Sequence, residues 1–212
     1  MKTVPPIRIL IADDHLVFRL GIRSLLQAEP GIDVVGEAAT GERAIELYRQ
    51  LSPDVLLLDL RMPQGGGIHV VQQVKKFAPE AKILVLTSYE VEEEIYQILQ
   101  AGARGYALKD IDRTQLVEAL RRIHAGEKWI VPTIANRIAE RAQRPPLTAR
   151  EIEVLRLLVR GLTNREIAGV LQIADSTIKN HVNNIISKLD VSDRTEAVAY
   201  SLSRGIIAMD DL

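Results

Sequence analysis

The sequence predicts an α/β region with a doubly wound sheet of five parallel strands, followed by a small all-α region of four helices. Three observations lead to this prediction. Short apolar runs alternate with amphipathic stretches in the first half, which is typical of strand–helix units around a parallel sheet. The alternation stops near Gly126. From Leu147 onward, the apolar residues recur with helical spacing only.

The apolar runs and the stretches between them place each element of the α/β region. Strands are expected over residues 7–12, 34–38, 55–58, 83–86 and 105–108. Helices are expected over residues 16–28, 42–50, 68–77, 92–101 and 113–125. Helices on both faces of an open sheet follow from this alternation.

Two similar helix starts open the all-α region. Thr148 with Glu151, and Thr163 with Glu166, have the spacing of a capping box, in which two side chains satisfy free amide groups at a helix start. Gly161 suits the left-handed end of the first of these helices. Two helices joined by a tight turn are therefore expected, and further helices follow over residues 175–189 and 193–203.

A polar, Arg-rich stretch separates the two regions. We interpret residues 126–146 as a linker, with room for one short helix between residues 132 and 141. The predicted domains are residues 1–125 and residues 147–212, each long enough to bury a core of its own.

The composition excludes several classes of protein. Hydrophobic residues make up 47% and charged residues 26%, which is typical of a globular chain. The absence of cysteine excludes disulfides, thiolate nucleophiles and thiolate metal sites. Lys and Arg number 27 against 28 Asp and Glu, so net charge does not indicate a nucleic-acid or membrane partner. No apolar run is long enough to span a bilayer and no signal peptide is recognisable, so we expect a cytoplasmic protein without a membrane partner.

Polar residues follow the strands of the predicted sheet. Asp13 and Asp14 come after the first strand, Asp59 after the third, Thr87 after the fourth and Lys109 after the fifth. The carboxyl ends of parallel strands meet in one crevice, so these side chains are expected to converge. Three neighbouring carboxylates require a cation, and their oxygen ligands suit Mg²⁺. Asp59 is placed to attack phosphorus, with a metal and a lysine neutralising the phosphoryl oxygens.

These residues, together with the run Asp59-Leu60-Arg61-Met62-Pro63, resemble the receiver domain of two-component response regulators over roughly the first 125 residues. The resemblance implies a flavodoxin-like fold in which Asp59 is the phosphoacceptor for a sensor histidine kinase or a small phosphodonor. It also implies that Asp14, Asp59 and the carbonyl of Arg61 hold Mg²⁺, with Asp13 supporting it mostly through water. No other cofactor is expected.

The same resemblance assigns the switch. Lys109 is expected to pair with the phosphoryl group, Thr87 to move and hydrogen-bond it, and Tyr106 occupies the family's aromatic switch position. Arg61 and Tyr89, each two positions beyond a site residue, are expected to tune the lifetime of the acyl phosphate. Near Gly66 the family often has an acidic or amide residue, whereas this chain has Gly65-Gly66-Gly67. We expect this difference to affect the flexibility of the loop more than the chemistry of the site.

The helix expected over residues 175–189 has two different faces. Its apolar residues form one stripe, and the opposite face is rich in asparagine. Asparagine pairs a donor with an acceptor that can read an adenine edge, whereas lysines and a helix start suit phosphates. The predicted DNA contacts are Thr177, Lys179, Asn180, His181, Asn183, Asn184, Ser187 and Lys188.

From Leu147 on, basic and acidic residues are balanced, so electrostatics alone does not favour DNA. The motifs Leu147-Thr148-Ala149-Arg150-Glu151 and Ser176-Thr177-Ile178-Lys179-Asn180-His181-Val182 nevertheless resemble the LuxR-type helix-turn-helix. The resemblance makes the third helix the recognition helix for double-stranded operator DNA, and gives the fourth a role in packing and dimerisation.

Together the two resemblances imply a regulator of the NarL/FixJ class. Phosphorylation of Asp59 is expected to promote homodimerisation and operator binding, and the receiver is a phosphoacceptor without turnover rather than an enzyme.

Three alternatives stay open. The first is a regulator that works without phosphorylation and uses the receiver only to dimerise. The second is a phosphatase or phosphotransferase with an aspartyl nucleophile, although the haloacid-dehalogenase-like enzymes carry a general acid where this chain has Arg61. The third is a C-terminal bundle that binds protein instead of DNA.

Overall fold

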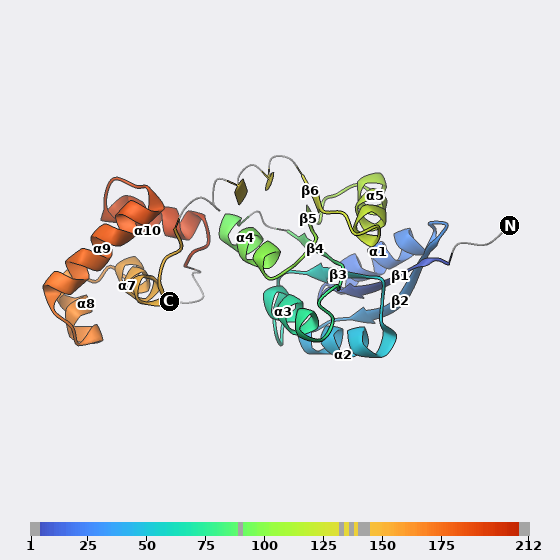
Figure 1. The fold of residues 1–212 in the computed structure, drawn as a ribbon, viewed down its shortest axis with the longest axis horizontal. Helices are drawn as coiled ribbons and strands as arrows, with labels where there is room; N and C mark the ends of the chain where they lie inside the picture. Colours follow the sequence, from blue (N-terminus) through green and yellow to red (C-terminus); the bar gives the residue numbers. More distant parts are fainter. Residues whose placement is uncertain (1–4, 89–90, 132–133, 136–137, 140–144, 208–212) are drawn as a thin grey trace. The chain divides into compact units, whose positions relative to one another are not determined.

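The computed structural model describes residues 5–88, 91–131, 134–135, 138–139 and 145–207 (Figure 1). The chain divides into two compact units, the first with residues 1–90 and 95–135 and the second with residues 91–94 and 136–212. The domain boundaries at residues 125 and 147 stay predictions, and the short helix expected over residues 132–141 falls largely outside the described residues.

The first unit contains a parallel sheet with the strand order β2-β1-β3-β4-β5-β6. The strands are β1 (Ile7–Ala12), β2 (Ile32–Ala38), β3 (Val55–Asp59), β4 (Ile83–Thr87), β5 (Gly105–Leu108) and β6 (Trp129–Ile130). The five predicted strands are confirmed, and the order of the first five is that of a doubly wound flavodoxin-like sheet. Strand β6 was not predicted, because two residues are too few to show a strand period.

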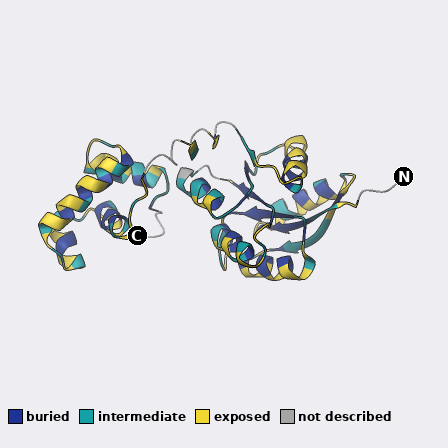
Figure 2. Ribbon diagram, viewed as in Figure 1, coloured by how far each residue is buried: buried dark blue, intermediate teal, exposed yellow. Residues whose placement is uncertain are grey.

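Helices cover both faces of this sheet (Figure 1). They are α1 (Leu16–Gln27), α2 (Gly41–Leu51), α3 (Gly67–Phe77), α4 (Glu92–Gln100) and α5 (Arg113–His124). Ile9, Ile11 and Leu57 pack on the face covered by α1 and α5, while α2 and α3 lie on the other face. Strands β3 and β4 are buried along their whole length, so the strand ends that carry Asp59 and Thr87 are held by a packed core (Figure 2).

The second unit contains α7 (Ala149–Val159), α8 (Asn164–Leu171), α9 (Asp175–Leu189) and α10 (Arg194–Ser203), which share one apolar core. Both predicted capping boxes are present, one from Thr148 with Glu151 and one from Thr163 with Glu166. The fourth helix begins one residue later than predicted, because the Asp193 side chain caps it by accepting from two backbone amides.

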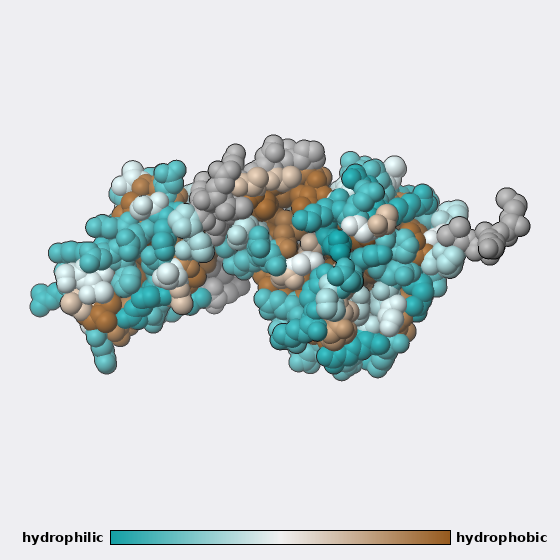
Figure 3. Space-filling view, in the orientation of Figure 1, coloured by the Kyte–Doolittle hydropathy of each residue, from teal (hydrophilic) through white to brown (hydrophobic). Residues whose placement is uncertain are grey.

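The surface in view is mostly hydrophilic over both units (Figure 3). Among the described residues, no helix is long and apolar enough to cross a bilayer. A few apolar side chains are nevertheless exposed, and three of them lie on α1: Leu16 (57%), Val17 (85%) and Leu20 (48%).

Candidate functional site: an acidic pocket and a polar recognition helix

The pocket forms where β1, β3, β4 and β5 end side by side. Lys109 lies just beyond β5, and its Nζ is 2.8 Å from Asp13 Oδ2 and 2.8 Å from Asp59 Oδ2. The backbone amide of Lys109 donates to the Thr87 carbonyl at 2.8 Å, which joins the ends of β4 and β5. One ammonium group therefore bridges carboxylates from two strands that are far apart in the sequence.

Burial shapes the electrostatics of the pocket. Asp13 and Asp59 are only 2% and 3% exposed. Burial raises the pKa of Asp59 above its ordinary value, although the hydrogen bond and charge of Lys109 act in the opposite direction. Burial lowers the pKa of Lys109, but its hydrogen bonds to Asp13 and Asp59 outweigh burial and raise it. The pocket thus holds more negative charge than its lysine balances.

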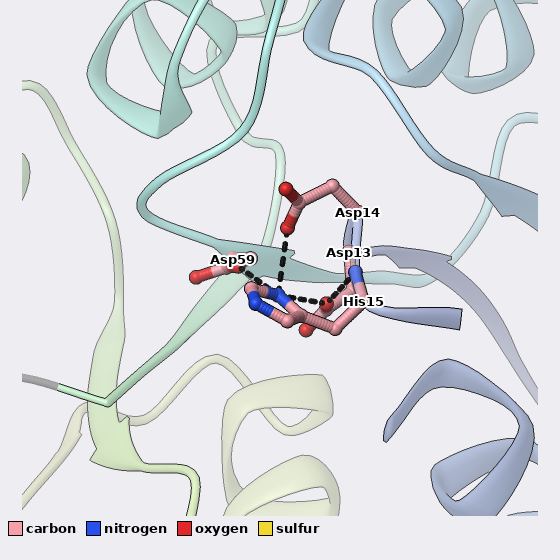
Figure 4. A group of neighbouring side chains, drawn as sticks. All are labelled: Asp13, Asp14, His15 and Asp59. Carbon is pink, nitrogen blue, oxygen red and sulfur yellow. Dashed lines mark hydrogen bonds and ion pairs between the residues drawn. The ribbon is translucent and has the colours of Figure 1, made fainter. Parts of the chain in front are cut away.

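His15, which was not among the predicted site residues, also lies in the pocket. Its Nδ1 is 2.8 Å from Asp14 Oδ1 and 3.4 Å from Asp13 Oδ1 (Figure 4). The only sequence signal is its position directly after the two aspartates, which a helix cap would explain equally well.

The acidic cluster is typical of a magnesium site. Asp13, Asp14, His15 and Asp59 each offer one ligand atom, and these atoms all lie within 4.8 Å of one another. Three of the four are carboxylate oxygens, the ligands that Mg²⁺ prefers. The donor set therefore fits the predicted ion.

The remaining predicted residues lie around this cluster. Thr87 and Tyr106 are buried, at 1% and 0% exposure, on β4 and β5. Arg61 is exposed, and its backbone amide donates to Asp59 Oδ1 at 3.3 Å. Tyr89 lies outside the described residues.

Two residues of α1 support the pocket and carried no signal in the sequence. Arg19 donates from Nη1 to the carbonyl of Asp13 at 2.5 Å and pairs with Glu37 at 3.2 Å. The ring of Phe18 lies 4.8 Å from Lys109 Nζ, a cation–π distance. Helix α1 thus contacts both the main chain of Asp13 and the bridging lysine.

Comparison with known proteins decides the family. Residues 9–121 match the family model of the response regulator receiver domain, and residues 145–201 match that of the luxR family of bacterial regulatory proteins. The response regulator protein VraR of Staphylococcus saprophyticus is 41% identical over 207 residues, which cover 95% of this chain and 99% of VraR. This chain belongs to the NarL/FixJ class of response regulators. VraR of Staphylococcus aureus is 40% identical over 206 residues, with the same coverage.

Solved response regulators resemble this one in structure. RcsB of Salmonella enterica serovar Typhimurium, bound to the promoter P1flhDC with the phosphomimetic BeF3⁻, has a TM-score of 0.71 and 31% identity, covering 93% of this chain and 98% of RcsB. ChrA of a heme-sensing two-component system has a TM-score of 0.57 and 36% identity, covering 96% of this chain and all of ChrA. The regulator is thus a two-component receiver joined to a LuxR-type DNA-binding domain, not a classical enzyme, and its receiver implies a kinase partner.

In the regulator's helix-turn-helix, α9 has the two faces that its sequence indicates. Ile178, Val182, Ile185 and Leu189 are buried in the core of the second unit. The opposite face exposes Thr177, Lys179, Asn180, Asn183, Asn184 and Ser187, and His181 is half-buried at the boundary.

Lys188 differs from the other predicted DNA contacts. It is half-buried, and its Nζ lies 2.7 Å from Glu151 Oε2, inside the domain. Lys179, in contrast, is 65% exposed and pairs only with Asp175 of its own helix among the contacts that the structure gives, at 3.2 Å.

Proposed function

We propose that transfer of a phosphoryl group to Asp59 switches this regulator into a homodimer that binds double-stranded operator DNA. The single observation that carries the proposal is Lys109 bridging Asp13 and Asp59 at 2.8 Å each. This contact holds a cation beside the nucleophilic carboxylate, where the cation can also pair with an oxygen of the incoming phosphoryl group.

In the proposed reaction an oxygen of Asp59 forms a bond to phosphorus. The bond from phosphorus to the donor breaks at the same time, and the donor atom keeps the electron pair. The donor is a phosphohistidine of a sensor histidine kinase or a small acyl phosphate. The receiver catalyses only its own phosphorylation and dephosphorylation.

The other pocket residues have supporting roles in this proposal. Asp14, Asp59 and the Arg61 carbonyl would hold Mg²⁺, with Asp13 supporting it mostly through water, and the bound ion would supply positive charge to neutralise the phosphoryl oxygens. Lys109 pairs with one of those oxygens, and the Thr87 hydroxyl donates to another. Movement of Thr87 is accompanied by movement of Tyr106, which shifts the receiver between two states.

The phosphorylated state is proposed to dimerise and then to bind two operator half-sites. Three neighbouring apolar side chains on α1 are exposed, and a second copy that covered them would remove apolar surface from water. On DNA, the exposed Asn180, Asn183 and Asn184 are proposed to read bases, with His181 at the edge of this surface. The exposed Thr177, Lys179 and Ser187 are proposed to contact phosphates. RcsB, one of the solved relatives, is bound to a promoter.

The test is intact mass and oligomeric state after incubation with acetyl phosphate and Mg²⁺, comparing the wild type with Asp59→Asn. We expect one phosphoryl mass gain and a dimer for the wild type, and neither for the variant. A mass gain that persists in Asp59→Asn would contradict the assignment of the phosphoacceptor. No gain with any donor would favour a regulator that works without phosphorylation.

A further inference from the structure

An ion pair joins the end of the recognition helix to the start of α7. Lys188 in the last turn of α9 donates to Glu151 Oε2 at 2.7 Å, and Glu151 lies in the first turn of α7. We propose that Lys188 is a positioning residue that fixes α9 for DNA binding and does not itself contact DNA phosphate. This inference rests on the proposed DNA binding of the second unit.

The position of Lys188 does not suit a phosphate contact. Its side chain is 23% exposed, compared with 65% for Lys179 on the same helix. Its ammonium group donates to Glu151 and to the carbonyl of Pro146, just before α7, at 3.3 Å. An ammonium has three protons, so two of them already have partners within the chain.

Glu151 keeps Lys188 in place. The Glu151 side chain is only 4% exposed. Burial raises its pKa, but hydrogen bonds from Lys188 and Thr148 outweigh burial and lower it. If Lys188 turned outward to a phosphate, a buried carboxylate would lose its charged partner, which is strongly unfavourable. The ion pair is therefore expected to persist when DNA is bound.

One oxygen of Glu151 accepts two hydrogen bonds, from different helices' ends. Oε2 accepts from the backbone amide of Thr148 at 2.7 Å, which completes the capping box of α7, and it also accepts from Lys188. A cation in the last turn of a helix further complements the partial negative charge of that end. The carboxyl end of α9 is thus fixed to the beginning of α7.

Two other basic side chains of the second unit also donate to backbone carbonyls of the same unit. Arg194 Nη2 donates to the Leu162 carbonyl in the turn before α8, at 2.9 Å. Arg150 Nη2 donates to the Leu171 carbonyl at the end of α8, at 3.3 Å. Contacts within the domain thus hold several of its basic side chains, Lys188 among them.

The experiment measures how binding of the full-length protein to DNA depends on salt. The probe is a fluorescein-labelled 24-base-pair duplex of mixed sequence, because sequence-independent binding depends on phosphate contacts. The variants are Lys179→Gln, Lys188→Gln, Glu151→Gln and Glu151→Gln/Lys188→Gln. A glutamine in place of Glu151 can retain the capping box, and the double variant leaves the net charge unchanged.

Losing one phosphate contact lowers the slope of log Kobs against log[salt] by about 0.9. We expect that decrease for Lys179→Gln and a wild-type slope for the double variant. In urea unfolding without DNA, we expect Lys188→Gln to lower the midpoint and the added Glu151→Gln to recover most of the loss.

A slope decrease of about 0.9 in the double variant would overturn the inference, because Lys188 would then contact phosphate. Strictly additive effects of the two single substitutions on unfolding would also overturn it, because the ion pair would then be energetically absent. If the wild-type protein does not bind the duplex, the proposed DNA binding itself is contradicted. This result differs from both outcomes above, in which the wild type binds the duplex or only the unfolding data are at issue.

Discussion

Replacing Asp59 by Asn is expected to stabilise the first unit when no divalent cation is present. The ligand atoms of Asp13 and Asp59 lie within 4.8 Å of each other, which at an effective dielectric constant of about 20 is a repulsion of at least about 3.5 kcal/mol. The contact of Asp59 with Lys109 at 2.8 Å offsets this by about 6 kcal/mol. These two charge terms leave a net attraction of at most about 2.5 kcal/mol, which a screened repulsion from the more exposed Asp14 reduces further. The cost of burying the carboxylate, several kcal/mol, therefore decides the sign.

An asparagine avoids that cost and still accepts a hydrogen bond from Lys109. We therefore expect the free energy of unfolding to rise by about 1 to 2 kcal/mol at pH 7 in EDTA. The assay is urea unfolding followed by the fluorescence of Trp129, the single tryptophan, which packs against the core of the first unit. Asp54→Asn is the matched control, because the Asp54 carboxylate accepts from the Arg8 amide at 2.8 Å outside the pocket.

The dependence on pH and on metal follows from the same charges. Because the folded-state pKa of Asp59 is raised, its contribution to stability is present below its unfolded pKa and is lost as pH rises through the folded pKa. The advantage of Asn is thus expected at pH 7 and not in acid. Mg²⁺ at ten times its Kd should stabilise the wild type by about 1.4 kcal/mol and the variant less. An unfolding free energy of Asp59→Asn at or below the wild-type value at pH 7 in EDTA would refute this reasoning.

Two further substitutions test parts of the first unit. Thr40 Oγ1 caps α2 by accepting a hydrogen bond from the Arg43 amide at 3.2 Å. Thr40→Ala removes this cap and should lower the free energy of unfolding, followed by Trp129 fluorescence, by about 1 kcal/mol. Thr40→Ser keeps the hydroxyl and should retain the wild-type value. Gly67→Ala places a Cβ 2.8 Å from the Asp59 carbonyl oxygen, so the loop beside the acceptor must shift. We expect the rate of phosphorylation with acetyl phosphate to fall about 100-fold. Gly21→Ala, with no atom within 4 Å, is its control, and equal rates for the two variants would contradict the steric argument.

Much of the fold was predictable because each signal was local. The apolar runs of β1 and β5 predicted those strands to the residue, and the capping boxes at Thr148 and Thr163 predicted two helix starts. The pocket was predictable because parallel strand ends must converge, which brought Asp13, Asp59 and Lys109 together.

What the sequence could not predict depends on contacts between distant residues. His15 is next to Asp14 in the sequence, but only the fold brings its ring toward Asp59, at 3.9 Å. The helical period of α9 leaves Lys188 beside the polar face, and only the packing of α7 against α9 brings it to Glu151, 37 positions earlier. A side chain at the edge of a helical face can turn either way, and its partner decides which.

The strand order also determines how the first unit can fold during synthesis. The inner strand β1 is made first, but its partner β3 and the strands beyond it come much later in the chain. Parallel pairing of this kind depends on contacts distant in sequence, which makes folding slower than in a helical bundle. Strands β5 and β6 pair only after Ile130 has left the ribosome, so the sheet's edge is completed before the helical unit emerges.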